Sequence, residues 1–298
     1  MARIGIVIVN YNGKDYQNDC IRSIYDMDYK DLEIIVVDSD SKDNSIKLLR
    51  DEFPKVHILE QNENVGVAKG NNIGIEYSLE LGTEYTLIMN NDVVLDSSML
   101  SLLVQKSQGK FVTVPKIFYY EPNNLIWFAG GDFDFRKGTV YHWGMRGMEN
   151  GQFDEDFFIN YSPTCCMLVP NHVFKLTGLM DEKYFMYYDD CDFCLRLLDC
   201  GVKLLFVHDA IMWHKVSSST GGEMSPLSVY YMTRNRFYFI KKFPAHMSLL
   251  AKIYSFASNI VQYLISPIRS KNDKYILPAM HDYYHGEMGR KDNLFKHK

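Results

Sequence analysis

The stretch IGIVIVNYNG, residues 4–13, determines how the beginning of the chain folds. Its first six residues are apolar and mostly β-branched, and they lack the polar alternation of a half-exposed strand. Such a continuous run is typical of a strand that is buried on both faces, as in a parallel sheet covered by helices. Asn10, Tyr11 and Asn12 follow directly, so we expect the strand to end in a polar turn.

The same arrangement repeats along the following segments of the chain. Further strands are predicted at LEIIVVDSDS (residues 32–41), VHILEQ (56–61) and YTLIMNNDVV (85–94). Helices are predicted at residues 15–28, at 42–53 and, after a glycine-rich turn, within 64–81. Strands that alternate with helices of this length indicate an α/β fold, with a mostly parallel sheet flanked by helices.

Composition excludes several classes of function. The 298 residues are 47% hydrophobic and 23% charged, as in a packed globular protein, and the net charge of -5 argues against non-specific binding to nucleic acid. The sequence contains no run of 18 apolar residues and no signal peptide, so we expect a cytoplasmic protein. Its six cysteines should then stay reduced.

Polar side chains follow three of the predicted strands. Asn10 and Tyr11 follow the first, Asp38 ends the second, and Asn90 to Asp92 follow the fourth. In sheets of this kind ligands bind beyond the carboxyl ends of the strands, so these residues should face one crevice. Two carboxylates there suit Mg²⁺ or Mn²⁺ bound together with substrate phosphates. The GxGxxG pattern of a dinucleotide enzyme is missing after the first strand.

A second notable stretch is YFMYYDDCDFCLR, residues 184–196, which places three aspartates beside four aromatic residues. Asp189 and Asp190 would suit the N-terminus of a helix, where acidic side chains are common. Cys191 and Cys194 form a CxxC pattern, but no second pair completes a four-ligand zinc site. We therefore interpret these cysteines as buried helix residues.

The motifs together resemble glycosyltransferase family 2, the inverting sugar-nucleotide enzymes with the GT-A fold. The resemblance rests on VNYN, VVDSDSKDNS, NVGVAKGNNIG, LIMNNDVV and the stretch from YFMYYDDCDF to AIMWHKVSSS, which occur in one order over about residues 3–240. Within the family the likeness is to a bacterial rhamnosyltransferase-like branch that builds surface polysaccharides. One departure is Asn90, where the family often has aspartate.

The resemblance implies a role for each motif residue. Asp190 falls on the general base of an inverting transfer, and Asp189 stands where the family usually has glutamate. Asp92 and His214 would approach a Mg²⁺ or Mn²⁺ ion. Other residues are implied in contacts with the nucleotide-sugar: Asn10, Tyr11, Asp38, Lys69, Asn72, Asn90, Asn91 and Arg234. The acceptor site would involve Trp127, Gly130, Asp132 and Tyr188.

The expected organisation is a catalytic domain at residues 1–240 and a helical extension at 241–298. Residues up to about 110 would form the nucleotide-sugar-binding half and residues 111–240 the acceptor half. The segment 241–270 mixes basic and apolar residues at near-helical spacing. Two interpretations stay open: contact with the inner face of the cell membrane, or packing of an apolar helix side on the catalytic domain or on a second subunit in a homodimer.

The expected function is therefore metal-dependent transfer of a sugar from a UDP- or dTDP-activated donor to a saccharide acceptor. The resemblance implies a lipid-linked acceptor and a role in making capsule, O-antigen or cell wall. The alternative is a non-catalytic carbohydrate-binding or scaffolding module on the same fold. A glycoside hydrolase would also use paired carboxylates, but it needs no nucleotide crevice. Residues 216–222, rich in serine, threonine and glycine, are expected to form a loop that closes over the donor.

Overall fold

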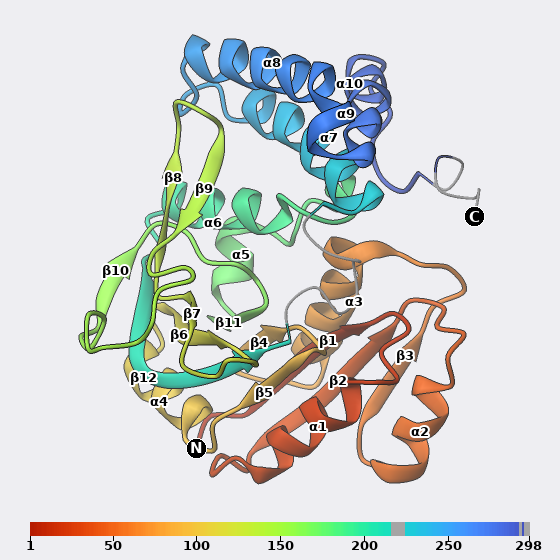
Figure 1. Ribbon diagram of the computed structural model, residues 1–298. Coiled ribbons are helices and arrows are strands. Elements are labelled where there is room, and N and C mark those ends of the chain that lie inside the picture. Colours follow the sequence, from red (N-terminus) through yellow and green to blue (C-terminus); the bar gives the residue numbers. More distant parts are fainter. Residues whose placement is uncertain (216–223, 292–293, 295–298) are drawn as a thin grey trace.

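The computed structural model describes residues 1–215, 224–291 and 294, and the expected closing loop lies outside these residues. The described part forms a ten-stranded sheet with helices on both faces, a separate two-stranded hairpin and a cap of C-terminal helices (Figure 1). The main sheet has the order β10-β12-β6-β11-β4-β1-β2-β3, with β5 and β7 pairing at its side. The predicted α/β class is confirmed.

The beginning of the chain alternates strands and helices as its sequence predicts. Strands β1, β2, β3 and β4 pair in parallel, with β1 in the middle between β2 and β4. The bounds are β1 (Ile4–Asn10), α1 (Gln17–Asp26), β2 (Leu32–Asp38), α2 (Ser45–Glu52), β3 (His57–Glu60), α3 (Gly66–Glu80) and β4 (Tyr85–Met89). The main strands are buried on both faces, as the apolar runs require.

The glycines of α3 have a packing role. A Cβ added at Gly70 would lie 2.8 Å from the side chain of Val9, and one at Gly74 would lie 2.3 Å from the side chain of Val7. Real Cβ atoms do not approach so closely, so these glycines allow α3 to lie directly on β1. The helix begins at Gly66, so the glycines of the stretch that the sequence predicted to start as a turn lie within the helix.

The second half of the chain adds antiparallel strands to the same sheet. β11 (Cys166–Pro170) lies antiparallel between β4 and β6 (Val112–Tyr119), and β12 (Leu204–His214) runs parallel to β6. The remaining strands are β5 (Val93–Leu95), β7 (Ile126–Phe128), β10 (Phe157–Ile159) and the hairpin β8 (Gly131–Asp134) with β9 (Thr139–His142). The helices here are α4 (Met99–Ser107), α5 (Val173–Thr177), η1 (Glu182–Tyr184) and α6 (Asp189–Asp199).

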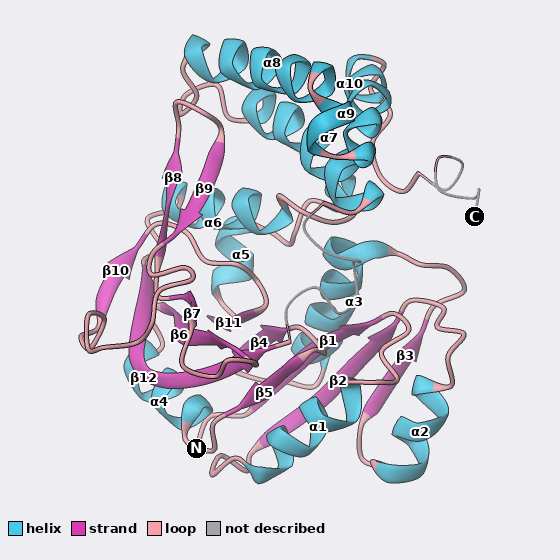
Figure 2. Cartoon of the chain, viewed as in Figure 1, coloured by secondary structure: helices cyan, strands magenta, loops and turns pink. Residues whose placement is uncertain are grey.

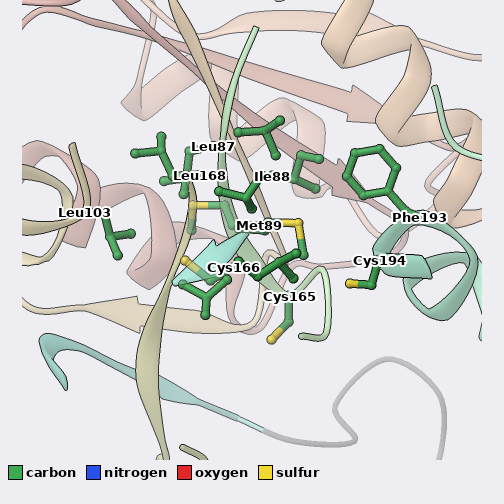
Figure 3. Packing of buried hydrophobic residues seen from close by; sticks show 14 of the residues in the cluster. Leu87, Ile88, Met89, Leu103, Cys165, Cys166, Leu168, Phe193 and Cys194 are labelled. Carbon is green, nitrogen blue, oxygen red and sulfur yellow. The ribbon is translucent and has the colours of Figure 1, made fainter. Parts of the chain in front are cut away.

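One hydrophobic core joins the two halves. Leu87, Ile88 and Met89 of β4 pack with Leu168 of β11 in the middle of the sheet (Figure 3). Phe193 of α6 belongs to the same cluster, so the helix that begins with Asp189 is anchored directly to the sheet. Cys191 and Cys194 are buried on α6, while Cys200 beyond it is exposed.

The C-terminal helices stack at one end of the molecule, above the carboxyl edge of the sheet (Figures 1 and 2). They are α7 (Pro226–Lys242), α8 (Leu249–Leu264), α9 (Ser266–Arg269), η2 (Lys271–Tyr275) and α10 (Ile276–Tyr284). Tyr230 and Tyr231 of α7 share a hydrophobic cluster with Ala279 of α10. Within the described ranges, no helix has both the length and the apolar character needed to cross a membrane.

Packing within the chain accounts for only part of this helix. α8 buries Ala251, Ser255 and Asn259, and its half-buried Ile260 and Tyr263 pack on a hydrophobic cluster of α7 and α10. Most of its other large apolar side chains are exposed, with Leu249 at 71% and Leu264 at 68%. The remaining alternatives place these exposed side chains against something outside the chain.

Candidate active site

A buried polar network joins the ends of β1, β2 and β4. The amide of Asn10 donates to Asp38 at 3.0 Å and to Ser45 at 3.0 Å, and its oxygen accepts from Asn91 at 2.8 Å. Asp38 also accepts from the backbone N–H of Ser41 at 3.0 Å. These bonds fix the shape of the carboxyl edge, as the parallel register of the strands predicts.

A cavity of about 770 Å³ opens beside this edge and reaches up to the C-terminal helices. This volume is that of a pocket for a molecule of nucleotide-sugar size. Its walls come from the N-terminal half, from β7, β9 and α6, and from α7, α8, α9 and η2. The predicted site residues that line it are Tyr11, Asn90, Asn91, Asp92, Trp127, Tyr188, Asp189, Asp190 and His214.

The other predicted site residues lie outside the cavity wall. Asn10 and Asp38 are buried in the polar network, and Lys69 is exposed on α3. Asn72 uses its amide to bind the backbone of Met180, at 2.9 Å in both directions. Three further residues do not line the cavity either: Gly130, Asp132 and Arg234.

Arg234 in particular is fully buried and already paired. Its guanidinium donates to the carbonyls of Gly289 at 2.7 Å and Tyr184 at 3.2 Å, and it lies over the rings of Tyr230 and Tyr231. Arg236, two residues along α7, lines the cavity instead. Residues two apart point to different faces of a helix, so only one of these arginines can face the cavity.

Asp92 and His214 meet in the wall of the cavity although they are far apart in sequence. β12 pairs antiparallel with β5, which places His214 opposite Val93. As a result, His214 Nε2 lies 3.1 Å from Asp92 Oδ1, and both side chains are buried. The other ring nitrogen, Nδ1, is buried and has no hydrogen-bond partner in the described part of the chain.

These two residues fit a divalent cation. Asp92 supplies the carboxylate oxygen that Mg²⁺ and Mn²⁺ both bind, and His214 supplies an imidazole nitrogen. The described residues contain no group of three or more His, Cys, Asp or Glu side chains that could enclose an ion. A cation here would therefore complete its coordination with substrate oxygens and water, which is usual for Mg²⁺.

The start of α6 is held in an unusual backbone conformation. Phe185, Tyr187 and Tyr188 have φ values of 68°, 62° and 68°, a region that non-glycine residues seldom occupy. Asn235 of α7 stabilises this turn, because its amide contacts the carbonyl oxygens of Tyr184, Met186 and Tyr187 at 2.8 to 2.9 Å. Strain of this kind often occurs where a side chain must be presented to a ligand.

The three aspartates of α6 lie in different environments. Asp192 is fully buried and faces away from the cavity, paired with Arg196 and Lys242 at 2.6 Å each. Asp190 lines the cavity and accepts from the hydroxyl of Tyr161 at 2.6 Å and from the N–H of Cys191 at 2.7 Å. Asp189 also lines the cavity, where burial, and next the neighbouring Asp190, raise its pKa to about 8.

Sequence reasoning missed two residues beside these carboxylates. Tyr161 is buried with a pKa held well above its usual value, first by burial and then by Asp190, so it stays a hydroxyl donor. His142 lines the cavity edge-on to Trp127, and burial lowers its pKa. Neither residue belongs to a recognisable motif, so only their position in the fold identifies them.

The match to known families is extensive. Residues 5–176, more than half of the chain, match the model of Glycosyl transferase family 2. The chain belongs to glycosyltransferase family 2. It is therefore a glycosyltransferase, an enzyme that transfers a sugar from a nucleotide-sugar donor.

Curated relatives of this glycosyltransferase include two bacterial enzymes. It is 26% identical to the dTDP-rhamnosyl transferase RfbF of Shigella flexneri over 286 residues, which cover 91% of this chain and 90% of the relative. It is 27% identical to the glycosyltransferase GlyG of Streptococcus pneumoniae over 226 residues, covering 73% and 72% of the two chains.

Solved structures of similar fold are more distant in sequence. One is GalNAc-T7 with UDP, GalNAc and Mn²⁺, which matches with a TM-score of 0.63 at 15% identity over 96% of this chain and 58% of that one. Another is the mannosyltransferase PcManGT of Pyrobaculum calidifontis with GDP-Man and Mn²⁺, with a TM-score of 0.55 at 13% identity over 96% and 88%. At these identities the likeness shows that the GT-A fold is shared.

Proposed function

We propose that this glycosyltransferase moves a sugar from a UDP- or dTDP-activated donor to a lipid-linked saccharide, with inversion, in the synthesis of a bacterial surface polysaccharide. One observation carries the proposal: Asp92 with His214 and Asp190 with Tyr161 line the same cavity. The first pair suits the diphosphate of a donor, and the second suits the hydroxyl of an acceptor. The family and the relationship to a dTDP-rhamnosyl transferase support the choice of donor and pathway.

Asp92 and His214 would hold a Mg²⁺ or Mn²⁺ ion. A bound ion of this kind offsets the negative charge that develops on a leaving diphosphate. Asn90 and Asn91, next to Asp92 in the cavity wall, offer amide groups to the sugar or the ribose. Two proteins that share the fold were solved with Mn²⁺ and a nucleotide or nucleotide-sugar, which supports the choice of metal.

Asp190 would act as the general base. Burial raises the pKa of the neighbouring Asp189 to about 8, so Asp189 carries a proton at neutral pH and is not available to accept one. Tyr161 and the N–H of Cys191 each occupy one oxygen of Asp190, and each oxygen keeps a second lone pair for an acceptor hydroxyl. The acceptor proton would thus pass to Asp190 as the new glycosidic bond forms.

Nucleotide binding tests the donor part of this proposal. We would measure Tm with UDP, dTDP, GDP and CDP, each with Mn²⁺, Mg²⁺ or EDTA, because a ligand of the folded state raises Tm. We expect a metal-dependent rise with UDP or dTDP alone, and its loss in Asp92→Asn. As a matched control, Asp96→Asn changes a half-buried aspartate outside the cavity lining and should keep the rise. A lack of response to every nucleotide would contradict the proposal.

Product formation tests the transfer itself. A non-catalytic carbohydrate-binding module on this fold would bind nucleotide without releasing it from a sugar donor. We expect release of UDP or dTDP from the matching donor in the presence of a saccharide acceptor, with an inverted anomeric centre in the product. Retention of configuration would overturn the assignment of Asp190 as a base that acts in a single displacement.

A further inference from the structure

Helix α8 has an inverted arrangement of polar and apolar side chains. Its buried face carries Ala251, Ser255 and Asn259, each four residues after the last, and Gln262 lies on the same side. The outer face carries large apolar side chains that solvent reaches. Their exposed fractions are Leu249 71%, Leu250 62%, Ile253 55%, Phe256 47%, Val261 55% and Leu264 68%.

The apolar surface continues beyond the helix. Ile265 is 43% exposed and Ile268, on α9, is 93% exposed. In Figure 1, α8 forms the outer edge of the helical cap, above α7 and the tip of the β8–β9 hairpin. Exposed apolar side chains that gather on one helix face mark an interaction surface, whereas those scattered singly need no explanation. We call the residues of this patch, from Leu249 to Ile268, the α8 outer face.

The charge of the segment around α8 indicates which kind of surface could cover this face. The sequence from residue 243 to 272 contains no Asp or Glu, although the whole chain has a net charge of -5. Its cations include Lys252 and Lys271, which are both exposed. A basic, acid-free segment with exposed leucine, isoleucine, valine and phenylalanine complements an anionic lipid surface.

The inner side of the same helix reaches the catalytic cavity. Asn259 and Gln262 line the cavity that also contains Asp92 and Asp190. Asn259 is only 4% exposed, and its Nδ2 has no hydrogen-bond partner among the described residues. A buried amide donor without a partner calls for a polar ligand, because leaving it unpaired is unfavourable.

We propose that the α8 outer face docks on an anionic membrane surface and that Asn259, on the inner side, binds the polar head of a membrane-anchored acceptor. The second part rests on the proposed function. Sixteen residues of helix measure about 24 Å, and an α-helix is about 10–12 Å wide. A helix lying flat on the bilayer would therefore place the cavity about one helix diameter above the headgroups.

Vesicle sedimentation tests the docking. The full chain is mixed with vesicles of equal parts phosphatidylglycerol and phosphatidylcholine, or of phosphatidylcholine alone. We expect at least tenfold tighter binding to the anionic vesicles. The triple variant Ile253→Gln, Phe256→Gln, Leu264→Gln should lose binding at least tenfold, and the double variant Lys252→Glu, Lys271→Glu should lose the preference for anionic lipid.

A matched triple variant controls for the loss of exposed apolar area in general. Leu79→Gln, Met148→Gln and Leu176→Gln remove side chains that are 37%, 53% and 59% exposed on other parts of the surface. This control should bind vesicles like the wild type. Both triple variants should keep the wild-type Tm and the wild-type response to nucleotide, so that failure of docking is separable from failure of the donor site.

Three outcomes would overturn the proposal. The first is that the wild type stays in the supernatant with anionic vesicles. The second is that it binds neutral vesicles equally well. The third is that the α8 triple variant binds anionic vesicles as the wild type does. Light scattering then identifies the alternative occupant. A wild-type dimer that the α8 variant converts to monomer, without any vesicle binding, would assign the face to a second copy of the chain.

Binding of the acceptor head has its own test. Asn259→Leu fills the same space without the amide, and Asn123→Leu serves as a control at an exposed asparagine outside the cavity lining. We expect Asn259→Leu to raise the KM for a lipid-linked acceptor at least fivefold, with vesicle binding and the nucleotide response unchanged. An unchanged acceptor KM would remove Asn259 from the proposal.

Discussion

The carboxyl group of Asp190 combines access to the cavity with a fixed orientation. Tyr161 reaches it from the loop after β10, and the helical N–H of Cys191 holds its other oxygen. Asp192, two residues later, has the same chemistry but is buried in ion pairs with Arg196 and Lys242. Because the two residues lie on different sides of the helix, Asp190 is accessible to substrate, whereas Asp192 anchors α6.

We predict that Asp190→Asn lowers kcat by at least about a hundredfold, the usual contribution of a general base. The nucleotide-dependent rise in Tm should persist, because in the proposed mechanism Asp190 contacts the acceptor and not the nucleotide. Tyr161→Phe removes only the hydroxyl that orients Asp190 and should lower kcat far less, by about tenfold. Steady-state assays with the matching donor measure both effects, and a variant Asp190→Asn with near wild-type kcat would exclude this base.

Asp189 should give the protein a distinctive pH dependence of stability. Its carboxyl keeps its proton up to a pH of about 8 in the folded state, whereas an unfolded aspartate releases it near pH 4. Between these values the folded state binds more protons than the unfolded state. The stability contributed by the protonated carboxyl is thus fully present at about pH 4 and is lost as pH rises to about 8.

Asp189→Asn removes this titration. We expect its Tm to exceed that of the wild type increasingly from about pH 5 to about pH 8.5, by at least about 3 °C at the upper end, since a tenfold change in proton affinity is worth about 1.4 kcal/mol. Asp26→Asn, at an exposed aspartate, is the control and should follow the wild type. A difference that stays constant with pH would mean that Asp189 is ionised throughout.

At the scale of elements, two arginines of α7 lie in different environments. Arg234 points inward and ties α7 to the turn before α6 and to Gly289 near the C-terminus. Arg236 lines the cavity and donates to the carbonyl of Lys137 in the β8–β9 hairpin at 2.9 Å. The sequence RNR, residues 234–236, does not indicate which of the two arginines lines the cavity.

Substituting each arginine should separate stability from activity. Arg234→Met removes the charged donor of the hydrogen bonds to the carbonyls of Gly289 and Tyr184, of which only the second keeps a bond, from Asn235. We therefore expect a loss of about 2–3 kcal/mol and a Tm lower by about 5 °C or more. Arg236→Met should change Tm by less than about 2 °C but lower kcat/KM about tenfold. Thermal melts and kinetics on the same preparations decide, and a reversed pattern would place Arg234 in the site.

The sequence predicted the elements better than the contacts between them. The apolar runs of β1, β2 and β4 located the sheet, and its parallel register followed from the alternation with helices. The sequence predicted a glycine-rich turn before the third helix, yet Gly70 and Gly74 lie within α3 and allow it to pack on β1. Asp92 and His214 were predicted as site residues from the family motifs. The pairing of β5 with β12 that brings them together could not be predicted, because strand partners depend on the whole topology.

The same limit applies to the cavity and to α8. Tyr161 and His142 carry no motif, and they reach the site through the folding of the loop after β10 and of the hairpin. Helical spacing identified α8 as amphipathic but did not indicate which face turns inward. The structure shows that its fully buried positions carry small or polar residues, against the usual pattern of a surface helix.

At the scale of the whole molecule, the C-terminal helices belong to the same folded unit as the catalytic part. The sequence suggested a boundary near residue 240, but α7 is shared by both sides of it. Tyr230 and Tyr231 pack against Ala279, while Phe237 packs against Ile276 and Met280 of α10. The cavity itself takes part of its wall from α8, α9 and η2. We infer that residues 241–298 complete the fold as well as the site.

Truncation tests this inference, and we predict that residues 1–240 alone do not form a stable native state. Tyr230, Tyr231 and Phe237 are at most 6% exposed in the full chain, and removing α10 uncovers them. Exposing about half the area of three aromatic rings costs roughly 7 kcal/mol, against a total stability of about 5–15 kcal/mol for a typical domain. The fragment also lacks Lys242, the ion-pair partner of Asp181 and Asp192.

A longer fragment, residues 1–248, separates these two causes, because it restores Lys242 and still lacks α8 and α10. We expect both fragments to lose the cooperative thermal transition that the full chain shows in near-UV circular dichroism. If 1–248 melts like the full chain while 1–240 does not, the ion pairs of Lys242 are needed for stability, and the covering of the aromatic rings by α10 is not. If both melt like the full chain, residues 241–298 are an independent appendage, and the cavity walls they supply serve binding alone.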